Sequence, residues 1–435
     1  MELLLTFTYA TLFVFLITKI PFFHLKEIKI KWIIMVFLLK IFFGIVMAFI
    51  YTYIYPVRTD ADIYKYFDDS SILYNMLFTN PIYFVRMLFG INTDASELRP
   101  IFTQMLCWYN VDTLYNDNRT LIRLNTIFRF FSFGHYYVHV VFMCFISITG
   151  LVALFKTFTS IITNKTKELF FAVFLLPSVL FWGSGVMKDG LLLFSFGMFF
   201  YFFNQLLNTF TVKSLLWMCL FVFAISINKI YFLIAALPGM MAWYWSIKTN
   251  YQYSFYKFFL VHLFYFMVLL NIHNVLPSFN FAEMIYLKQH NFLNLAEFVK
   301  AGSIIHITRL EPTTTSFLIN TPEAIYHVLC RPFFFESRSP MILMAGMENL
   351  LILLILLTSL LFINKKAPKH QLTLLHFSIF FVLILFSIMG LVTPVLGALV
   401  RYKMPALPFL LLIFIILYDK EKLLKKFPFL TKILK

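Results

Sequence analysis

Long runs of apolar residues, separated by short polar connections, dominate the chain. Many of these runs exceed about 18 residues, which is enough for a helix to cross a bilayer. They are apolar on every face and lack the two-residue alternation of membrane-barrel strands, so they predict helices. Eleven transmembrane helices are expected, at 3–20, 32–55, 134–155, 167–183, 190–207, 213–227, 231–247, 257–276, 341–363, 372–397 and 404–418.

The composition agrees with this pattern. Hydrophobic residues make up 61% and charged residues only 13% of the 435 residues, and the mean hydropathy is +0.83. Soluble domains carry roughly 25% charged residues. We therefore predict an all-α, polytopic transmembrane bundle that forms one integral membrane domain, residues 1–435. The first segment lacks a basic start and a cleavage site, so we interpret it as a retained helix and not as a secretory signal.

Basic residues in the short connections indicate the orientation. Alternate connections, together with the C-terminal tail, hold nineteen lysines, whereas the short connections on the other side hold four basic residues, Lys188, Lys229, Arg401 and Lys403. Because Lys and Arg concentrate on the cytoplasmic side, we predict an outer N-terminus and a cytoplasmic C-terminus. This bias also explains most of the net charge of +16, so no nucleic-acid partner is inferred.

Two long polar segments, 56–133 and 277–340, are then predicted to lie outside the membrane as parts of the same domain. Both contain amphipathic, aromatic-rich stretches, such as 82–91 and 281–299. Such stretches are typical of short helices that lie at the membrane interface. The predicted fold thus includes short amphipathic helices in two long outer loops.

The sequence RTDADIYKYFDDS, 58–70, follows the second predicted helix on the outer side. Its carboxylates Asp60 and Asp62 could act as a general base or hold a divalent cation. They are the candidate catalytic pair, and the candidate ligands if a metal takes part. The alternative interpretation is a hydrated loop, where Asp is common.

The sequence FWGSGVMKDG, 181–190, places a charged pair between two uncharged apolar runs. Its glycines permit tight turns close to a ligand. Lys188 can neutralise a phosphate at the membrane edge, and Asp189 can orient it or cap the next helix. Ser184 and, farther along, Lys229 are accompanying candidates. In the alternative interpretation the lysine is a simple interfacial anchor.

Two later segments, 330–340 and 400–409, add arginines on the predicted outer side. Arginine binds phosphate oxygens in pairs and stays charged near lipid. The further candidates for binding phosphate or supporting that site are Arg331, Glu336, Arg338, Arg401, Tyr402 and Lys403. A charge pair at a loop end and a basic membrane anchor are the alternative interpretations of the two segments.

Carboxylates, lysines and arginines on one side of a membrane protein suit a substrate with its phosphate among the headgroups and its tail in the bilayer. A polyprenyl-phosphate or polyprenyl-diphosphate sugar is such a substrate. An aspartate would deprotonate an acceptor hydroxyl, the hydroxyl would attack the anomeric carbon, and basic residues would stabilise the leaving lipid phosphate. We predict an integral membrane glycosyltransferase that acts on the outer face and transfers sugar to a cell-envelope glycan or lipid acceptor.

Short motifs also carry a resemblance. The triplet Asp60-Ala61-Asp62 and the late Arg401-Tyr402 with Pro405 and Pro408 resemble segments of bacterial multi-spanning envelope glycosyltransferases of the GT-C-like class and of O-antigen-type polysaccharide polymerases. The segment PSVLFWGSGVMKDG, 177–190, is similar to one in bacterial membrane proteins of polysaccharide loci. The resemblance implies a bacterial inner-membrane location and a polyprenyl-linked sugar donor.

Several alternatives stay open. A polymerase or ligase of the O-antigen type would use the same kind of donor. A flippase or transporter of lipid-linked sugars would need polar residues along its helices, and Lys40 is one of few such residues. A membrane acyltransferase would need a histidine motif that is not evident, and a purely structural subunit would not need the outer charged clusters.

Overall fold

The computed structural model describes residues 1–54, 57–108, 116–336, 339–364 and 367–428. Within these ranges the chain is all-helical, as predicted, and the only strand-like pairings are two isolated bridges, Ile304–Val395 and Ile363–Tyr418. The chain divides into two compact units. Unit 1 comprises Met1–Thr157 and Val179–Ile230, and unit 2 comprises Phe158–Ser178 and Tyr231–Lys435. Whether the two units associate into the single integral membrane domain expected from the sequence stays a prediction.

Unit 1 holds the first part of the chain and a later helical hairpin. Its helices and turns are α1 (Glu2–Lys19), η1 (Pro21–Phe23), α2 (Ile30–Tyr53), η2 (Arg58–Asp60), α3 (Asp62–Thr79), α4 (Pro81–Phe89), η3 (Ser96–Leu98), α5 (Arg99–Phe102), α6 (Asp117–Ser132), α7 (Tyr136–Ile161), α9 (Pro177–Trp182), α10 (Lys188–Asn208) and α11 (Val212–Lys229). The unit boundaries fall after Thr157 in α7 and after Ser178 in α9.

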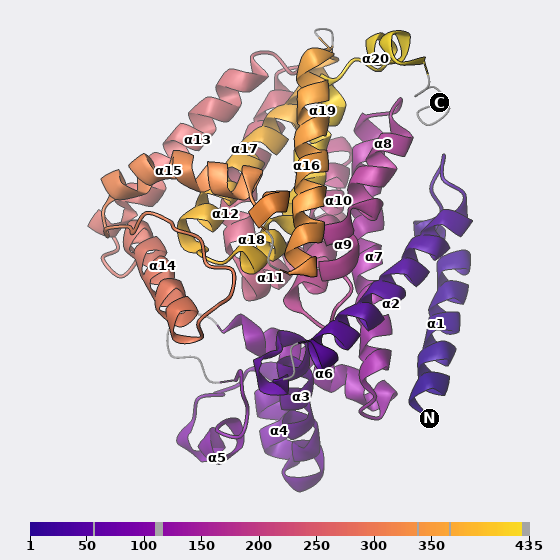
Figure 1. The fold of residues 1–435 in the computed structure, drawn as a ribbon, viewed down its shortest axis with the longest axis vertical. Helices are drawn as coiled ribbons and strands as arrows, with labels where there is room; N and C mark the ends of the chain where they lie inside the picture. Colours follow the sequence, from indigo (N-terminus) through magenta and orange to yellow (C-terminus); the bar gives the residue numbers. More distant parts are fainter. Residues whose placement is uncertain (55–56, 109–115, 337–338, 365–366, 429–435) are drawn as a thin grey trace. The chain divides into compact units, whose positions relative to one another are not determined.

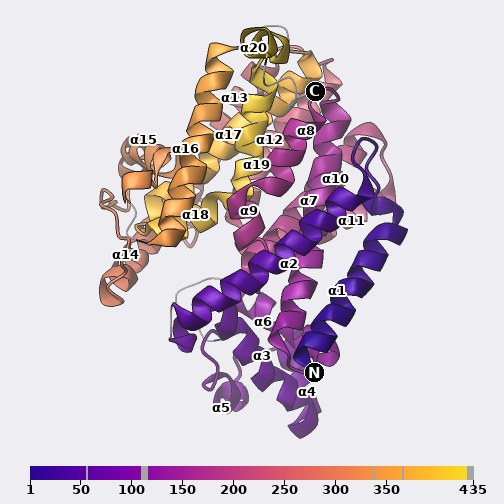
Figure 2. The same cartoon turned by 45° about the vertical axis from the view of Figure 1, so that its right-hand side comes forward.

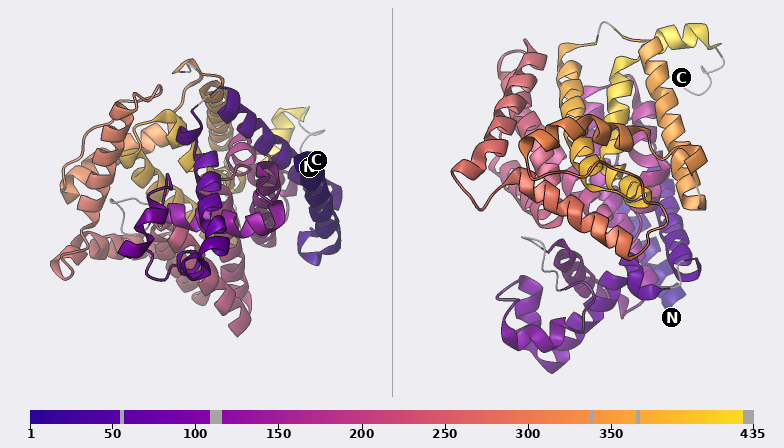
Figure 3. Two further views of the ribbon diagram at one scale, coloured as in Figure 1. Left: turned by 90° about the horizontal axis from the view of Figure 1, so that it is seen from below. Right: turned by 60° about the vertical axis from the view of Figure 1, so that its left-hand side comes forward.

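Unit 2 holds the remaining helices. They are α8 (Thr166–Phe170), the π-helical turn η4 (Phe171–Leu175), α12 (Tyr231–Lys248), α13 (Ser254–Asn271), η5 (Ile272–Asn274), α14 (Phe281–Phe298), α15 (Thr314–Cys330), η6 (Phe334–Glu336), α16 (Pro340–Leu361), α17 (Lys369–Val392), α18 (Leu396–Lys403), η7 (Met404–Ala406), α19 (Leu407–Leu417) and α20 (Lys420–Lys426). Helix α17 packs against α12, α15 and α19. In the right-hand view of Figure 3, α14 and α15 come to the front.

Nine helical segments among the described residues are long and apolar enough to cross a membrane. They are α1, α2, α7, α10, α11, α13 with η5, α16, α17, and α18 to α19. Each overlaps an expected span, so the structure supports a membrane protein built of helices. The two expected spans outside this set are 167–183 and 231–247.

Those two segments differ in form. The first is divided into α8, η4 and α9, because Leu176 is extended (ψ 127°) before Pro177, which opens α9. The second is the single helix α12, which keeps Pro238 in its interior. The predicted total of eleven spans therefore stays a prediction.

A proline also changes the end of the tenth expected span. Helix α17 ends at Val392, two residues before Pro394, instead of reaching 397. The next helix, α18, begins at Leu396, so Arg401 and Lys403 lie inside a helix and not in a connection before one. The helical path then tightens at η7, where Pro405 stands in the first turn.

In unit 1, helices α3, α4, α5 and α6 gather beyond one end of the long helices (Figures 1 and 2). Helix α1 begins at this end, since Glu2 accepts a hydrogen bond from the backbone N–H of Tyr137 in α7 (3.2 Å). Helix α11 ends here, since the Thr120 hydroxyl of α6 donates to the carbonyl of Ile227 (2.9 Å). We refer to this region as the α3–α6 end.

The two ends of unit 1 differ in charge. Basic residues at the α3–α6 end form ion pairs, namely Arg58–Asp68, Arg86–Glu97, Arg119–Asp94, Lys188–Asp117 and Lys229–Asp189. The opposite end, which we name the lysine end, carries Lys19, Lys26, Lys29, Lys31, Lys156 and Lys213. An excess of lysine at one end of a helical bundle is typical of a cytoplasmic face. The outer N-terminus and cytoplasmic C-terminus remain a prediction.

Candidate functional site

Both predicted catalytic carboxylates lie at the α3–α6 end. Asp60 closes the turn η2 and is exposed, whereas Asp62 opens α3 and is half-buried. The Lys65 ammonium stands 4.0 Å from Asp62, one turn along the same helix. Asp62 is thus the more enclosed of the two carboxylates, and a base is more effective where water is partly excluded.

Lys188 is held by side chains of two other helices. Its ammonium lies 2.8 Å from the carboxylate of Asp117 and donates to the side-chain oxygen of Asn118 (2.7 Å). The Tyr66 hydroxyl of α3 donates to the same Asn118 oxygen (3.2 Å), and the Tyr66 ring lies 5.6 Å from the ammonium. Lys188 is therefore fixed between α10, α6 and α3, which favours a site over a simple anchor.

The neighbouring residue, Asp189, forms a buried ion pair. Its carboxylate is fully buried and accepts from the ammonium of Lys229 at 3.0 Å. The Asn228 amide donates to the backbone carbonyl of Lys188 (3.2 Å), so α11 holds α10 through two adjacent residues. This geometry makes Asp189 and Lys229 positioning residues for Lys188.

The glycine-rich turn before Lys188 is held by the middle of α2. The buried ammonium of Lys40 donates to the carbonyl of Gly183 (2.9 Å). A side chain at Gly44 would collide with the carbonyl of Ser184, so the two backbones approach closely there. The Ser184 hydroxyl is buried and donates to the carbonyl of Leu180, which favours a structural role for this candidate.

The thiol of Cys107 is partly buried near charged groups of this end. Burial is the main reason that its pKa is raised to about 12, and the charge of Asp69 adds to this effect. Asp62 also raises this pKa, and Lys188 lowers it. Burial also raises the pKa of Asp69, although the backbone N–H of Leu106 donates to its carboxylate at 2.8 Å. Asp62 and Lys188 are connected through Tyr66, whose ring lies 5.6 Å from the Lys188 ammonium and which follows Asp62 by about one turn of α3.

Three residues of this region escaped the sequence analysis: Tyr66, Asp117 and Asn118. A signal was present, because the polar run Asn116 to Arg119 opens a helix, and the Asn116 side chain caps it by accepting from the Asn118 N–H (3.0 Å). Nothing in the local sequence, however, links this run to Lys188, which lies 70 residues beyond Asn118.

The arginine candidates belong to unit 2. Arg331 lies 3.2 Å from Glu336, so these two predicted residues are brought together. Arg401 is half-buried in α18, and the ring of Tyr402 lies 6.5 Å from that of Phe292. Arg338 lies outside the described residues.

Lys403 has a different environment from the one predicted. Its ammonium is buried and donates to the carbonyls of Val328 (3.1 Å) and Arg331 (2.9 Å) and to the side-chain oxygen of Asn349 (2.9 Å). These three bonds use the three donors of a lysine. They join the end of α15 to α16 and α18, which favours a structural role for Lys403 over the predicted contact with phosphate.

Within the described ranges, His, Cys, Asp and Glu side chains form no cluster of three or more that could hold a metal ion. The binding of a divalent cation by Asp60 and Asp62 therefore stays a prediction, with two carboxylates as its protein ligands. Oxygen ligands from a substrate phosphate commonly complete such sites.

Comparison of the chain with protein-family models, with curated protein sequences and with solved structures gives no match.

Proposed function

We propose that the chain is an integral membrane glycosyltransferase that takes sugar from a polyprenyl-phosphate or polyprenyl-diphosphate carrier on the outer face. The observation that carries this proposal is the position of Lys188, which is held by Asp117 and Asn118 beside Tyr66, about one turn of α3 from Asp62. A fixed cation beside a carboxylate at the end of a transmembrane helix matches a phosphate at headgroup depth. A cell-envelope glycan or lipid would be the acceptor.

The proposed chemistry needs one proton transfer and one displacement. Asp62 takes the proton of the acceptor hydroxyl, and the oxygen forms a bond to the anomeric carbon. The bond between that carbon and the carrier phosphate breaks, and the phosphate leaves with the electron pair. Lys188 stabilises the negative charge that develops on this phosphate. Asp60 is the second carboxylate. From the sequence, Arg331 and Arg401 of unit 2 remain candidates for binding phosphate.

A bacterial inner-membrane location, eleven spans with amphipathic helices in two outer loops, and an outer N-terminus are parts of the same proposal. The concentration of lysines in the connections at one end of unit 1 supports the orientation, because lysine is enriched on the cytoplasmic side. An O-antigen-type polymerase or ligase would use the same site, since both enzymes release a lipid phosphate.

The test uses purified protein in detergent, where both ends of the bundle are accessible. A lipid extract from the source cells serves as donor pool and their envelope glycans as acceptor. The protein should release free polyprenyl phosphate or diphosphate, measured by mass spectrometry. Asp62→Asn and Lys188→Met should each slow this release about 100-fold or more.

The matched control is Arg309→Met, which removes a largely exposed basic side chain in unit 2 and should leave the rate unchanged. A folded protein that binds the donor but releases no lipid phosphate would contradict the transferase proposal and favour a transporter. Equal rates in wild type, Asp62→Asn and Lys188→Met would refute the assignment of the site.

A further inference from the structure

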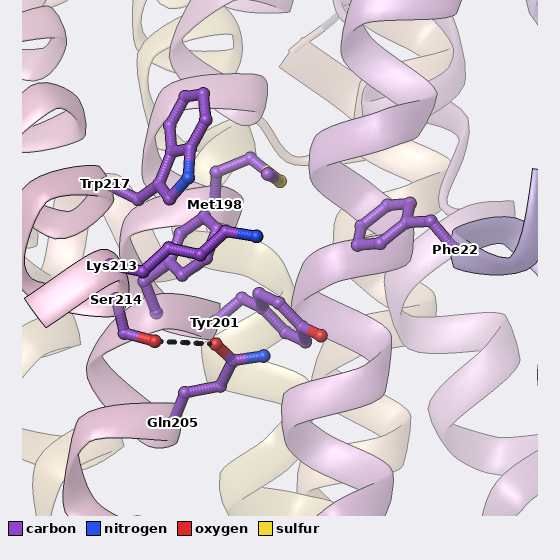
Figure 4. Close-up of a pocket in the computed structure, with 8 residues that line it drawn as sticks. Phe22, Met198, Tyr201, Gln205, Lys213, Ser214 and Trp217 are labelled. Carbon is purple, nitrogen blue, oxygen red and sulfur yellow. Dashed lines mark hydrogen bonds between the residues drawn. The ribbon is translucent and has the colours of Figure 1, made fainter. Parts of the chain in front are cut away.

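A pocket of about 460 Å³ lies at the lysine end of unit 1, between the end of α10, the start of α11 and the turn η1 (Figure 4). The side chains that shape it include Phe22, Tyr201, Phe202, Gln205, Lys213 and Trp217. The α10 residues that line this pocket, from Met198 to Gln205, follow Lys188 by 10 to 17 residues, which corresponds to roughly 15–25 Å at 1.5 Å per residue. The pocket is therefore distinct from the proposed catalytic region.

The polar groups of the pocket are arranged as donors. The exposed side chain of Lys213 directs its ammonium into the pocket (Figure 4). The side-chain oxygen of Gln205 accepts from the Ser214 hydroxyl (3.1 Å), and this bond turns the amide nitrogen towards the pocket (Figure 4). Thr211 donates to Ser214 (2.8 Å) and fixes the arrangement. No Asp or Glu is among the described residues that line the pocket, so it favours an anion.

An apolar groove continues from the same lysine. A second pocket of about 480 Å³ shares Lys213 and Trp217 and is completed by Leu216 and Leu220. Leu216 and Leu220 are 66% and 49% exposed and stand one turn apart on α11. A charged group and an exposed aliphatic surface are thus adjacent, as in the headgroup and chain of a lipid.

Aromatic rings give the pocket preformed walls. Trp217 stacks on Phe202 with ring centroids 6.0 Å apart, and Phe22 meets Tyr201 edge to face at 5.8 Å. The ammonium of Lys156 lies 4.7 Å from the Phe22 ring and adds a second positive charge nearby. Trp and Tyr beside lysine are typical of the level of lipid headgroups.

We propose that this pocket binds one molecule of an anionic glycerophospholipid. Its phosphate is bound by Lys213 and Gln205, and one acyl chain lies along Leu216 and Leu220. A single lysine near an anionic lipid contributes about 1 kcal/mol, equivalent to about fivefold in affinity. The proposal does not depend on the glycosyltransferase assignment, because it uses other residues at the other end of unit 1.

Quenching of tryptophan fluorescence tests this proposal directly. Full-length protein in phosphatidylcholine nanodiscs is titrated with phosphatidylglycerol that carries bromine on its acyl chains. The part of the fluorescence quenching that is seen in wild type and lost in Trp217→Phe reports on this pocket. Brominated phosphatidylglycerol should bind at least about fivefold more tightly than brominated phosphatidylcholine. Lys213→Gln should remove this preference, and Gln205→Leu, a second variant, should weaken it.

Lys248→Gln is the matched control, because Lys248 is an exposed lysine at a helix end and lines neither pocket. It should retain the full preference. Equal quenching by the two lipids, or an unchanged preference in both Lys213→Gln and Gln205→Leu, would overturn the proposal. Displacement of phosphatidylglycerol by millimolar inorganic phosphate would show a site for free anions and would overturn it as well.

Discussion

At the scale of single residues, the pair Lys188-Asp189 has two separate roles. Asp189 points into the protein to Lys229, whereas Lys188 reaches Asp117 and Asn118 at the α3–α6 end. Adjacent residues near the start of a helix point in different directions, about 100° apart. The buried pair thereby fixes the orientation from which Lys188 reaches the polar region.

Breaking the buried pair should destabilise unit 1. Asp189→Asn removes the carboxylate charge that faces the buried Lys229 ammonium, and we expect the free energy of unfolding to fall by about 3 kcal/mol or more. Denaturant unfolding monitored by circular dichroism measures this change. The double variant with Lys229→Met should recover part of the loss, because it removes the uncompensated charge.

An exposed pair in unit 2 provides the control for that measurement. Glu297 and Arg309 lie 3.3 Å apart with most of both side chains in solvent. Glu297→Gln should cost less than about 1 kcal/mol. Equal losses in Asp189→Asn and Glu297→Gln would contradict the role given to the buried pair.

A second residue-scale prediction concerns pH. Lys165, in the connection between α7 and α8, donates to the carbonyls of Ile415 and Tyr418. Burial lowers the pKa of its ammonium to about 8. Below pH 8 both folded and unfolded chains hold the proton, and the full cost of burying the charge is present. Between that pKa and the unfolded value of about 10.5, only the unfolded chain keeps the proton, so stability rises with pH.

Lys165→Met should remove this contribution to the slope. The free energy of unfolding is measured for wild type and variant from about pH 7 to pH 10. The value for wild type minus that for the variant should be constant below about pH 8 and should rise between about pH 8 and pH 10. Parallel curves for the two proteins would mean that Lys165 titrates alike in the folded and unfolded states.

At the scale of elements, the contact between α7 and α10 depends on glycine. A Cβ atom at Gly197 would collide with the carbonyl of Gly150, and one at Gly150 would collide with the backbone of Leu193. The two helices therefore cross with their backbones in contact, as small residues permit in membrane proteins. This contact holds α10, which begins at Lys188, against α7.

Gly197→Val should force these helices apart. We expect a loss of several °C in the midpoint of thermal unfolding and a lower yield of folded protein, because backbone atoms cannot move aside as a flexible side chain can. Gly397→Ala in α18 is the control, since nothing lies within 4 Å of the added atom, and it should stabilise by about 0.5–1 kcal/mol. A tolerated Gly197→Val would show that α7 and α10 do not meet there.

The elements also show what a sequence can predict. Apolar length is a local property, so the nine helices long enough to span a bilayer could be predicted from their composition. The break before Pro177 and the end of α17 before Pro394 were marked by proline, but the surrounding apolar residues concealed them. The partners of Lys188 could not be predicted, because a single sequence gives no signal for contacts between distant segments.

At the scale of the whole molecule, the proposed function depends on which end of unit 1 faces outward. The α3–α6 end joins Asp62, Lys188 and their partners, and the lysine end carries the candidate lipid pocket. Lipid-linked sugars exposed on the outer face reach only the first of these ends if the predicted orientation holds.

Side-specific labelling of cysteine measures this orientation. In a background in which the four native cysteines are replaced, Arg99→Cys introduces an exposed thiol at the α3–α6 end and Lys26→Cys one at the lysine end. A membrane-impermeant maleimide should label Arg99→Cys in intact spheroplasts and label Lys26→Cys only after the membrane is permeabilised. Labelling of Lys26→Cys alone before permeabilisation would place the α3–α6 end in the cytoplasm and contradict an outward-facing glycosyltransferase site.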